Sequence, residues 1–168
     1  MSSVDTAALG ESVLVAETGL GHLQLVARTA STAFLVDEPH SVGGLGSGPN
    51  PYDLLSTALG ACTAMTLRLY AERKGWNLGR IRVSVLHHRA SLQTRDLFER
   101  TIHLEGSLDE AQTARLLEIA DLCPVHRTLD RGSDVRTTLD LAAMEPKTGA
   151  TPSEHMRDMQ EASALVSG

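Results

Sequence analysis

The sequence predicts an α+β domain that combines antiparallel sheets with long helices. Strand-like and helix-like segments follow one another along the chain, the strand-like segments are separated by short turns, and the longest apolar periodicity is helical. With 168 residues, 42% of them apolar, the chain can bury one sizeable core. Only 3% of the residues are aromatic, so this core must consist mainly of Leu, Val, Ala and Met.

The N-terminal third predicts a meander of three strands followed by a loop. Residues 12–18, 22–29 and 32–36 form short segments rich in Val, Leu and Thr. Residues 37–51 are instead rich in Gly, Pro, Ser and Asn, which is typical of a loop. The glycines of this loop lack both the lysine of a P-loop and the spacing of a dinucleotide-binding turn, so we do not expect a phosphate site there.

A long helix is predicted from Pro51 to about Lys74. Asn50 suits the N-cap, Pro51 suits the first helical position, and Asp53 stands where the acid of a capping box would stand. Apolar residues then recur at steps of three and four, and Cys62 lies on this apolar stripe among small residues. Such a stripe indicates close packing.

The second half of the chain predicts a hairpin, a helix and a last strand. The alternating segments 80–90 and 97–105 read as two strands joined by a polar turn. A capping box at 107–110 begins a second helix, which should end at Leu122. Residues 135–141 supply a predicted last strand.

Cys123 precedes a proline, which restricts it to an extended conformation. If a short helix opens at Pro124, Cys123 becomes its N-cap residue, where free amides and the helix dipole favour a thiolate. Because Cys62 and Cys123 lie in different segments, only the tertiary fold can bring them together. The alternative is that both are small buried hydrophobic residues.

We expect one domain over residues 12–142, an N-terminal extension over 1–11 and a polar tail over 143–168. Residues 151–154 resemble a helix start, so the tail is either a short helix or a frayed terminus.

Charge and hydropathy exclude several classes of function. There are 15 basic and 21 acidic residues, and the basic ones are scattered, which argues against a nucleic-acid partner. No apolar run is long enough to span a membrane, and the N-terminal residues do not resemble a secretory signal. We therefore expect a cytoplasmic protein, in which a bond between two cysteines would be transient and catalytic or sensing.

A metal site is a further alternative. Cys62, Cys123 and His126 could supply three ligands, but the chain lacks the paired spacings of a zinc motif. We expect neither a metal nor another cofactor.

Two stretches resemble a known family. Residues 46–63, Gly-Ser-Gly-Pro-Asn-Pro-Tyr-Asp-Leu-Leu-Ser-Thr-Ala-Leu-Gly-Ala-Cys-Thr, and residues 122–126, Leu-Cys-Pro-Val-His, are similar to motifs of the OsmC/Ohr family (osmotically induced protein and organic hydroperoxide resistance). The order of predicted elements over residues 12–141 matches this family as well.

The resemblance implies an OsmC-like intertwined homodimer, with antiparallel sheets wrapped around two long central helices. It also implies a thiol peroxidase that reduces organic hydroperoxides. By motif position Cys62 would attack the peroxide, Cys123 would resolve the sulfenic acid as a disulfide, and a dithiol or protein thiol would reduce that disulfide. Apolar side chains around Cys62 favour an organic peroxide over hydrogen peroxide.

Further site residues follow from the resemblance. In peroxidase members an arginine from the N-terminal strands, held by a glutamate at the start of the long helix, keeps the attacking thiol ionised; Arg28 is our candidate for that arginine. The position of the glutamate is Tyr52 here, and the acid comes one residue later, at Asp53. We expect Tyr52, Met65 and His126 to contact the substrate.

The replacement of the glutamate by Tyr52 leaves a second function open. The chain could be a non-peroxidase member of the fold, a dimer that senses redox state or binds a small ligand.

Overall fold

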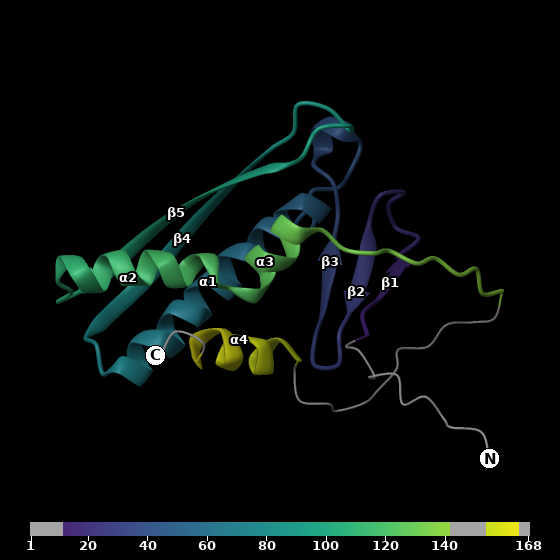
Figure 1. Ribbon diagram of the computed structural model, residues 1–168. Helices are drawn as coiled ribbons and strands as arrows, with labels where there is room; N and C mark the ends of the chain where they lie inside the picture. Colours follow the sequence, from purple (N-terminus) through teal and green to yellow (C-terminus); the bar gives the residue numbers. More distant parts are fainter. Residues whose placement is uncertain (1–11, 142–153, 165–168) are drawn as a thin grey trace, which may run out of the picture. The chain divides into compact units, whose positions relative to one another are not determined.

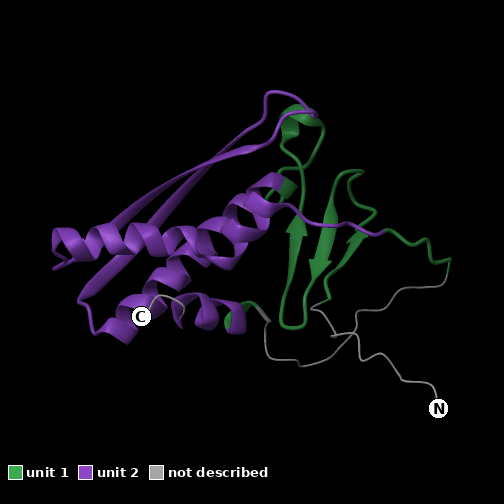
Figure 2. Cartoon of the chain, viewed as in Figure 1, with its two compact units in different colours: residues 1–51, 137–156 green, residues 52–136, 157–168 purple. Residues whose placement is uncertain are grey.

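The computed structural model describes residues 12–141 and 154–164, which form a mixed α+β fold of two antiparallel sheets and several helices (Figure 1). The chain divides into two compact units (Figure 2). The first comprises residues 1–51 and 137–156, and the second comprises residues 52–136 and 157–168. The predicted domain boundaries at 12 and 142 stay a prediction, and the predicted extension over 1–11 lies outside the described residues.

The first unit contains the predicted meander. Its strands are β1 (Leu14–Glu17), β2 (Leu25–Arg28) and β3 (Ala33–Val36), and they pair antiparallel in the order β1-β2-β3. The register places Leu14 opposite Arg28 and Leu25 opposite Val36. The prediction of three N-terminal strands is confirmed, with each strand shorter than its apolar segment.

The glycine-rich loop after β3 has a structural role. It contains a short 3-10 helix, η1 (His40–Val42), and is fastened by the buried Asp37, whose carboxylate accepts hydrogen bonds from the backbone amides of Leu45 and Ser47. These bonds, and above all one from the Ser47 hydroxyl, lower the pKa of Asp37. A Cβ on Gly44 would lie 1.8 Å from the carbonyl oxygen of Glu38, so only glycine fits there.

The second unit is built on α1 (Pro51–Lys74), which the sequence predicts with the same bounds. It packs against α2 (Glu110–Asp121) and the hairpin of β4 (Leu78–His88) and β5 (Leu97–Gly106) (Figure 1). The buried core of this unit consists of seven side chains: Leu67, Tyr70, Ala71, Leu78, Leu116, Ile119 and Ala120. Gly75, with φ +67°, ends α1 in the left-handed conformation that glycine favours.

The hairpin follows the predicted alternation. β4 and β5 pair antiparallel, and along both strands half-buried residues alternate with exposed ones. Gly60 of α1 faces Val83 and Val85 of β4, where a Cβ would meet their methyl groups at 3.5–3.8 Å. The small residues of α1 therefore lie next to the hairpin, which confirms the close packing expected for this stripe.

Three shorter helices complete the second half of the chain. Asp109 and Gln112 form the capping box of α2, in which the Asp109 carboxylate accepts from the Gln112 amide at 2.7 Å. This box lies two residues after the predicted position. α3 spans Pro124–Arg131, and α4 spans Glu154–Ala164. α4 lies in the tail, for which the sequence left a short helix and a frayed terminus open, and residues 151–153 of the expected helix start lie outside the described residues.

The predicted last strand is wrong. Residues 135–141 form no strand, and the side chains of Val135, Leu139 and Leu141 are 87%, 83% and 91% exposed. A strand needs a partner for its backbone groups, and neither described sheet pairs with this segment. Among the described residues, no helix is both long and apolar enough to cross a membrane.

Candidate active site

Two cysteines that are far apart in the sequence meet inside the second unit. Cys62 lies in α1 and Cys123 directly precedes α3, and their side chains are hydrogen-bonded to each other. Both are free thiols, with exposed fractions of 1% and 0%. Apolar side chains from α1, β4, β5 and α3 surround the pair: Leu59, Val85, Phe98, Val125 and Leu129. The fold therefore encloses two interacting thiols in an apolar compartment.

The N-terminus of α3 points at both sulfurs. Pro124 occupies the first helical position, and Cys123 caps the helix in an extended conformation with φ −59° and ψ 134°. The His126 amide donates to Cys123 Sγ at 3.4 Å, and the Val125 amide donates to Cys62 Sγ at 3.5 Å. The predicted N-cap role of Cys123 is confirmed. Amides in the first turn of a helix favour negative charge on the sulfurs they contact.

The surroundings shift the pKa values of the two thiols in opposite directions. The hydrogen bond from Cys62, assisted by the His126 amide, the Thr63 hydroxyl and the charge of Arg100, lowers the pKa of Cys123 to about 6, against the opposing effect of burial. The same bond to Cys123, and then burial, raise the pKa of Cys62. Both directions favour a negative charge on Cys123 over one on Cys62. The attacking role expected for Cys62 from motif position stays a prediction.

Arg100 supplies the positive charge beside the thiol pair. Its side chain is only 10% exposed and extends from β5 toward Thr63, which neighbours Cys123. Nη1 donates to Thr63 Oγ1 at 2.9 Å and to the Ala120 carbonyl oxygen at 3.1 Å, and Nη2 donates to Asp121 Oδ1 at 2.8 Å. A buried cation thus lies one side chain away from Cys123.

Sequence reasoning missed this arginine, although a signal was present. The alternation along β5 places Arg100 on the same face as Phe98, Ile102 and Leu104, which is the half-buried face. A charged residue at an inward-facing strand position needs a partner, and such positions are candidates for functional sites.

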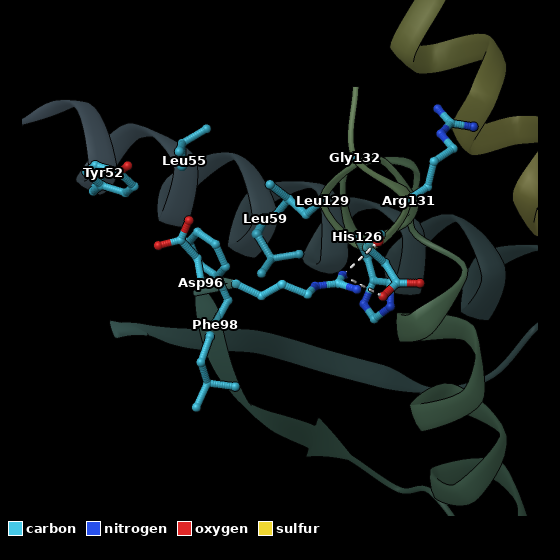
Figure 3. Close-up of a pocket in the computed structure, with 12 residues that line it drawn as sticks. Tyr52, Leu55, Leu59, Asp96, Phe98, His126, Leu129, Arg131 and Gly132 are labelled. Atoms are coloured by element: carbon cyan, nitrogen blue, oxygen red, sulfur yellow. Dashed lines mark hydrogen bonds and ion pairs between the residues drawn. The ribbon is translucent and has the colours of Figure 1, made fainter. Parts of the chain in front are cut away.

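The second unit contains a pocket of about 590 Å³ (Figure 3). Its wall includes Leu55 and Leu59 of α1, Phe98 of β5 and Leu129 of α3, with Tyr52 at one end. Three of these side chains, Leu59, Phe98 and Leu129, also pack on the cysteines. The pocket and the thiol compartment therefore share an apolar wall.

Polar groups gather at the rim of this pocket. Arg95 donates to the backbone oxygen of Asp130 at 2.8 Å, and both of their side chains are largely exposed. His126 also lines the pocket, with Nδ1 3.8 Å from Asp121 Oδ1. The pocket thus combines an apolar wall with a charged opening.

The family profile described as OsmC-like protein matches residues 44–138, which include the pocket, both cysteines and Arg100. The chain belongs to the OsmC-like family. No curated protein matches it.

Solved structures share the fold of this OsmC-like protein at low sequence identity. A Psychrobacter arcticus protein, provisionally named an osmotic stress induced and detoxification response protein, is 22% identical over 69% of this chain and 85% of its own, with a TM-score of 0.61. An OsmC-like protein of Mycoplasma pneumoniae is 20% identical over 71% and 86%, with a TM-score of 0.57. The organic hydroperoxide resistance protein OsmC of Legionella pneumophila is 17% identical over 73% and 90%, with a TM-score of 0.55.

Tyr52, the residue at the family's glutamate position, belongs to a cluster at the turn end of the hairpin, where β4 connects to β5. Its ring stacks on His87 at 4.5 Å between centroids, and its hydroxyl accepts a hydrogen bond from Arg89. Arg89 also holds Asp96 through two contacts, at 2.6 Å and 2.9 Å. In this OsmC-like protein the side chain of residue 52 is therefore hydrogen-bonded to an arginine of the hairpin turn.

The other predicted site residues, Arg28, Asp53 and Met65, have exposed side chains. Arg28 is an exposed residue of β2 in the first unit, so its role stays a prediction. Asp53 is exposed in the first turn of α1, and Met65 is 49% exposed further along that helix. Neither Asp53 nor Met65 lines the pocket described above.

Within residues 12–141 and 154–164, no group of three or more His, Cys, Asp or Glu side chains is arranged to hold a metal ion.

Proposed function

We propose that this OsmC-like protein is a thiol peroxidase that reduces organic hydroperoxides through a Cys62 sulfenic acid and a Cys62–Cys123 disulfide. The observation that carries the proposal is the buried, hydrogen-bonded pair of thiols at an apolar wall that it shares with the pocket. Two thiols already in contact can close a disulfide without a large change of the backbone.

A pair of thiols that holds one proton gives each step a balanced form. The proton first passes from Cys62 to Cys123 along their hydrogen bond, which leaves a Cys62 thiolate. This thiolate attacks the terminal oxygen of the peroxide, the O–O bond breaks, and Cys123 returns the proton to the leaving alkoxide, which departs as an alcohol. The Cys123 thiolate then attacks the sulfur of the Cys62 sulfenic acid, the S–S bond forms, and hydroxide leaves and takes a proton from solvent.

The surroundings of the pair support an organic peroxide as substrate. Leu59, Phe98 and Leu129 form the wall shared by the pocket and the cysteines, and such a wall favours an alkyl group over water. Both sulfurs are buried, so these side chains must rotate before a peroxide reaches Cys62. His126 and Tyr52 line the same pocket and are our proposed substrate contacts.

We also propose that the protein works as a homodimer in the cytoplasm and is recycled by a dithiol or a protein thiol. Support for a second copy comes from the exposed apolar side chains of Val135, Leu139 and Leu141, in an extended segment that pairs with neither described sheet. A partner chain could cover such a segment by strand addition.

One observation favours a second candidate function, a dimer that senses redox state or binds a small ligand. Tyr52 replaces the family's glutamate and contacts Arg89 and His87, while the pKa of Cys62, the attacking thiol expected from the motif, is raised by its hydrogen bond to Cys123 and by burial. A slow thiol pair of this kind could report oxidation without rapid turnover.

The test measures consumption of tert-butyl hydroperoxide with dithiothreitol as reductant. The wild type should turn over, Cys62→Ser should lose turnover, and Cys123→Ser should accumulate a sulfenic acid that dimedone traps. Arg82→Met is a matched control, because Arg82 pairs with Glu105 on the exposed face of the hairpin. If the folded wild type consumes no peroxide but forms the disulfide with a chemical oxidant, the peroxidase proposal is rejected in favour of the sensing function.

A further inference from the structure

Thr63 connects Arg100 to the thiol pair. Thr63 is fully buried, and its Oγ1 accepts a hydrogen bond from Arg100 Nη1 at 2.9 Å. The same oxygen lies 2.7 Å from the carbonyl oxygen of Leu59 and 3.7 Å from Cys123 Sγ. A hydroxyl has one hydrogen, so Thr63 can donate either to the carbonyl or to the sulfur.

The charge state of Cys123 decides between these two acceptors. A neutral thiol is a weak acceptor, whereas a thiolate attracts a hydrogen-bond donor strongly. Arg100 donates to a lone pair of Oγ1, so this contact does not use the hydroxyl hydrogen. The hydrogen can therefore turn toward the sulfur when the sulfur becomes negative. The guanidinium stays in place, since the Ala120 carbonyl oxygen and Asp121 hold its other N–H groups.

The groups that face Cys123 favour its negative charge. The Cys62 thiol approaches from α1, the His126 amide from α3, and Arg100 acts from β5 through Thr63. The acid nearest to this set, Asp121, is 63% exposed, pairs with Arg100 and lies 3.8 Å from the His126 ring. Its carboxylate is therefore on the solvent side of the arginine.

We propose that Arg100 is a positioning residue that acts through the Thr63 hydroxyl to hold the negative charge of the thiol pair on Cys123, and so prepares Cys123 to close the disulfide. The role in disulfide closure rests on the proposed peroxidase function. Arg100 opposes the first proton transfer, from Cys62 to Cys123. It favours the two later events, the return of that proton to the alkoxide and the attack of the Cys123 thiolate on the sulfenic acid.

The first experiment uses no peroxide. Thiolate absorbance at 240 nm is followed from pH 4 to 10 in the reduced full-length protein, because absorbance does not require that a reagent reach the buried sulfurs. The wild type should show one thiolate transition near pH 6. Cys62→Ser should also show one transition, but at a higher pH. Cys123→Ser should show no transition in the acid range.

Two substitutions break the connection at different points. Thr63→Val keeps the shape of the side chain and the arginine but removes the hydroxyl, and Arg100→Met removes the charge. Each should move the transition upward by about one pH unit, as expected on loss of a neighbouring opposite charge or donor. Arg100→Lys should move it less, and Arg82→Met should leave it unchanged.

Several results would overturn the proposal. These are a wild type without a transition below pH 8, a Thr63→Val variant that titrates like the wild type, or an Arg82→Met variant that shifts as much as Arg100→Met. Should Arg100→Met fail to fold by circular dichroism, Thr63→Val carries the test.

A second experiment measures disulfide closure. After a pulse of tert-butyl hydroperoxide, dimedone should trap several-fold more Cys62 sulfenic acid in Thr63→Val than in the wild type, because closure is slower. Equal trapping would reject the role in closure. If the titrations behave as expected but the wild type consumes no peroxide, the peroxidase function fails and the control of charge by Arg100 remains.

Discussion

Two arginines of the same hairpin, Arg100 and Arg89, have opposite consequences for their surroundings. Arg100 is 10% exposed, and its acid, Asp121, faces solvent. Arg89 is 28% exposed and grips the carboxylate of Asp96 with two donors, while its guanidinium lies over the Tyr52 ring at 4.7 Å.

The difference shows why one arginine influences chemistry and the other holds structure. Water does not screen the inner side of Arg100, so its charge acts on Thr63 and on the sulfur beyond. Arg89 is neutralised locally by Asp96, whose pKa is lowered to about 2 by hydrogen bonds from Arg89 and then from His87. Burial and the position of the counter-charge therefore matter more than the residue type.

The largest expected effect is on stability. Arg100→Met should lower the free energy of unfolding by about 2 kcal/mol, because it removes charge-assisted hydrogen bonds to Thr63, Ala120 and Asp121 in a buried site. Arg89→Met should cost clearly less, since its ion pair is near the surface. Urea unfolding followed by circular dichroism measures both. Equal losses for the two variants would break the comparison.

The thiol region should also give stability a pH dependence. Between about pH 6 and 9 the native pair holds one proton, with the charge on Cys123, whereas the unfolded chain holds two on ordinary thiols. The unfolded state binds more protons, so the free energy of unfolding should rise with pH in this window by about 1 kcal/mol per pH unit. The increment should be lost as pH falls through about 6.

Urea unfolding of the reduced wild type at pH 6, 7 and 8 checks this slope. The double variant Cys62→Ser with Cys123→Ser is the control, because it keeps every other titrating group. Parallel curves for the two proteins would show that the pair holds two protons in the folded state.

The Arg89 region should respond at acid pH instead. The pKa of Asp96 is lowered from 3.8 to about 2, so its stabilising effect should be complete above about pH 4 and lost as the pH falls toward 2. Asp96→Asn should lower the melting temperature at pH 5, and the difference from the wild type should shrink toward pH 2. Glu99→Gln is a control, since its pair with His88 is exposed. A difference that stays constant with pH would contradict the assignment.

The smallest effect is expected at Tyr52. Tyr52→Phe keeps the ring stacked on His87 and loses only the hydroxyl that accepts from Arg89. Because Asp96 continues to hold Arg89, KM for tert-butyl hydroperoxide should change less than about twofold. Tyr52→Leu should raise KM more, because it removes a flat wall at one end of the pocket. A large effect of Tyr52→Phe on kcat would instead give the hydroxyl a chemical role.

Several features could be predicted because they depend on neighbours in the sequence. Pro51 and Gly75 mark the ends of α1 through their own backbone preferences, and the alternation of the hairpin follows from the two faces of a strand. The N-cap position of Cys123 follows in the same way from Pro124. The segment 135–141 shows the limit of this reasoning, since a suitable alternation forms no strand without a partner edge.

The sequence by itself determined the elements of this protein, its family and the two cysteines that carry its proposed chemistry. Only the tertiary structure decided that these cysteines meet, that their surroundings lower the pKa of Cys123 and raise that of Cys62, and that Arg100 is the cation near them. The physical reason is that helix ends and strand alternation arise from local backbone geometry, whereas the position of a proton depends on distances between groups that up to 63 residues separate along the chain.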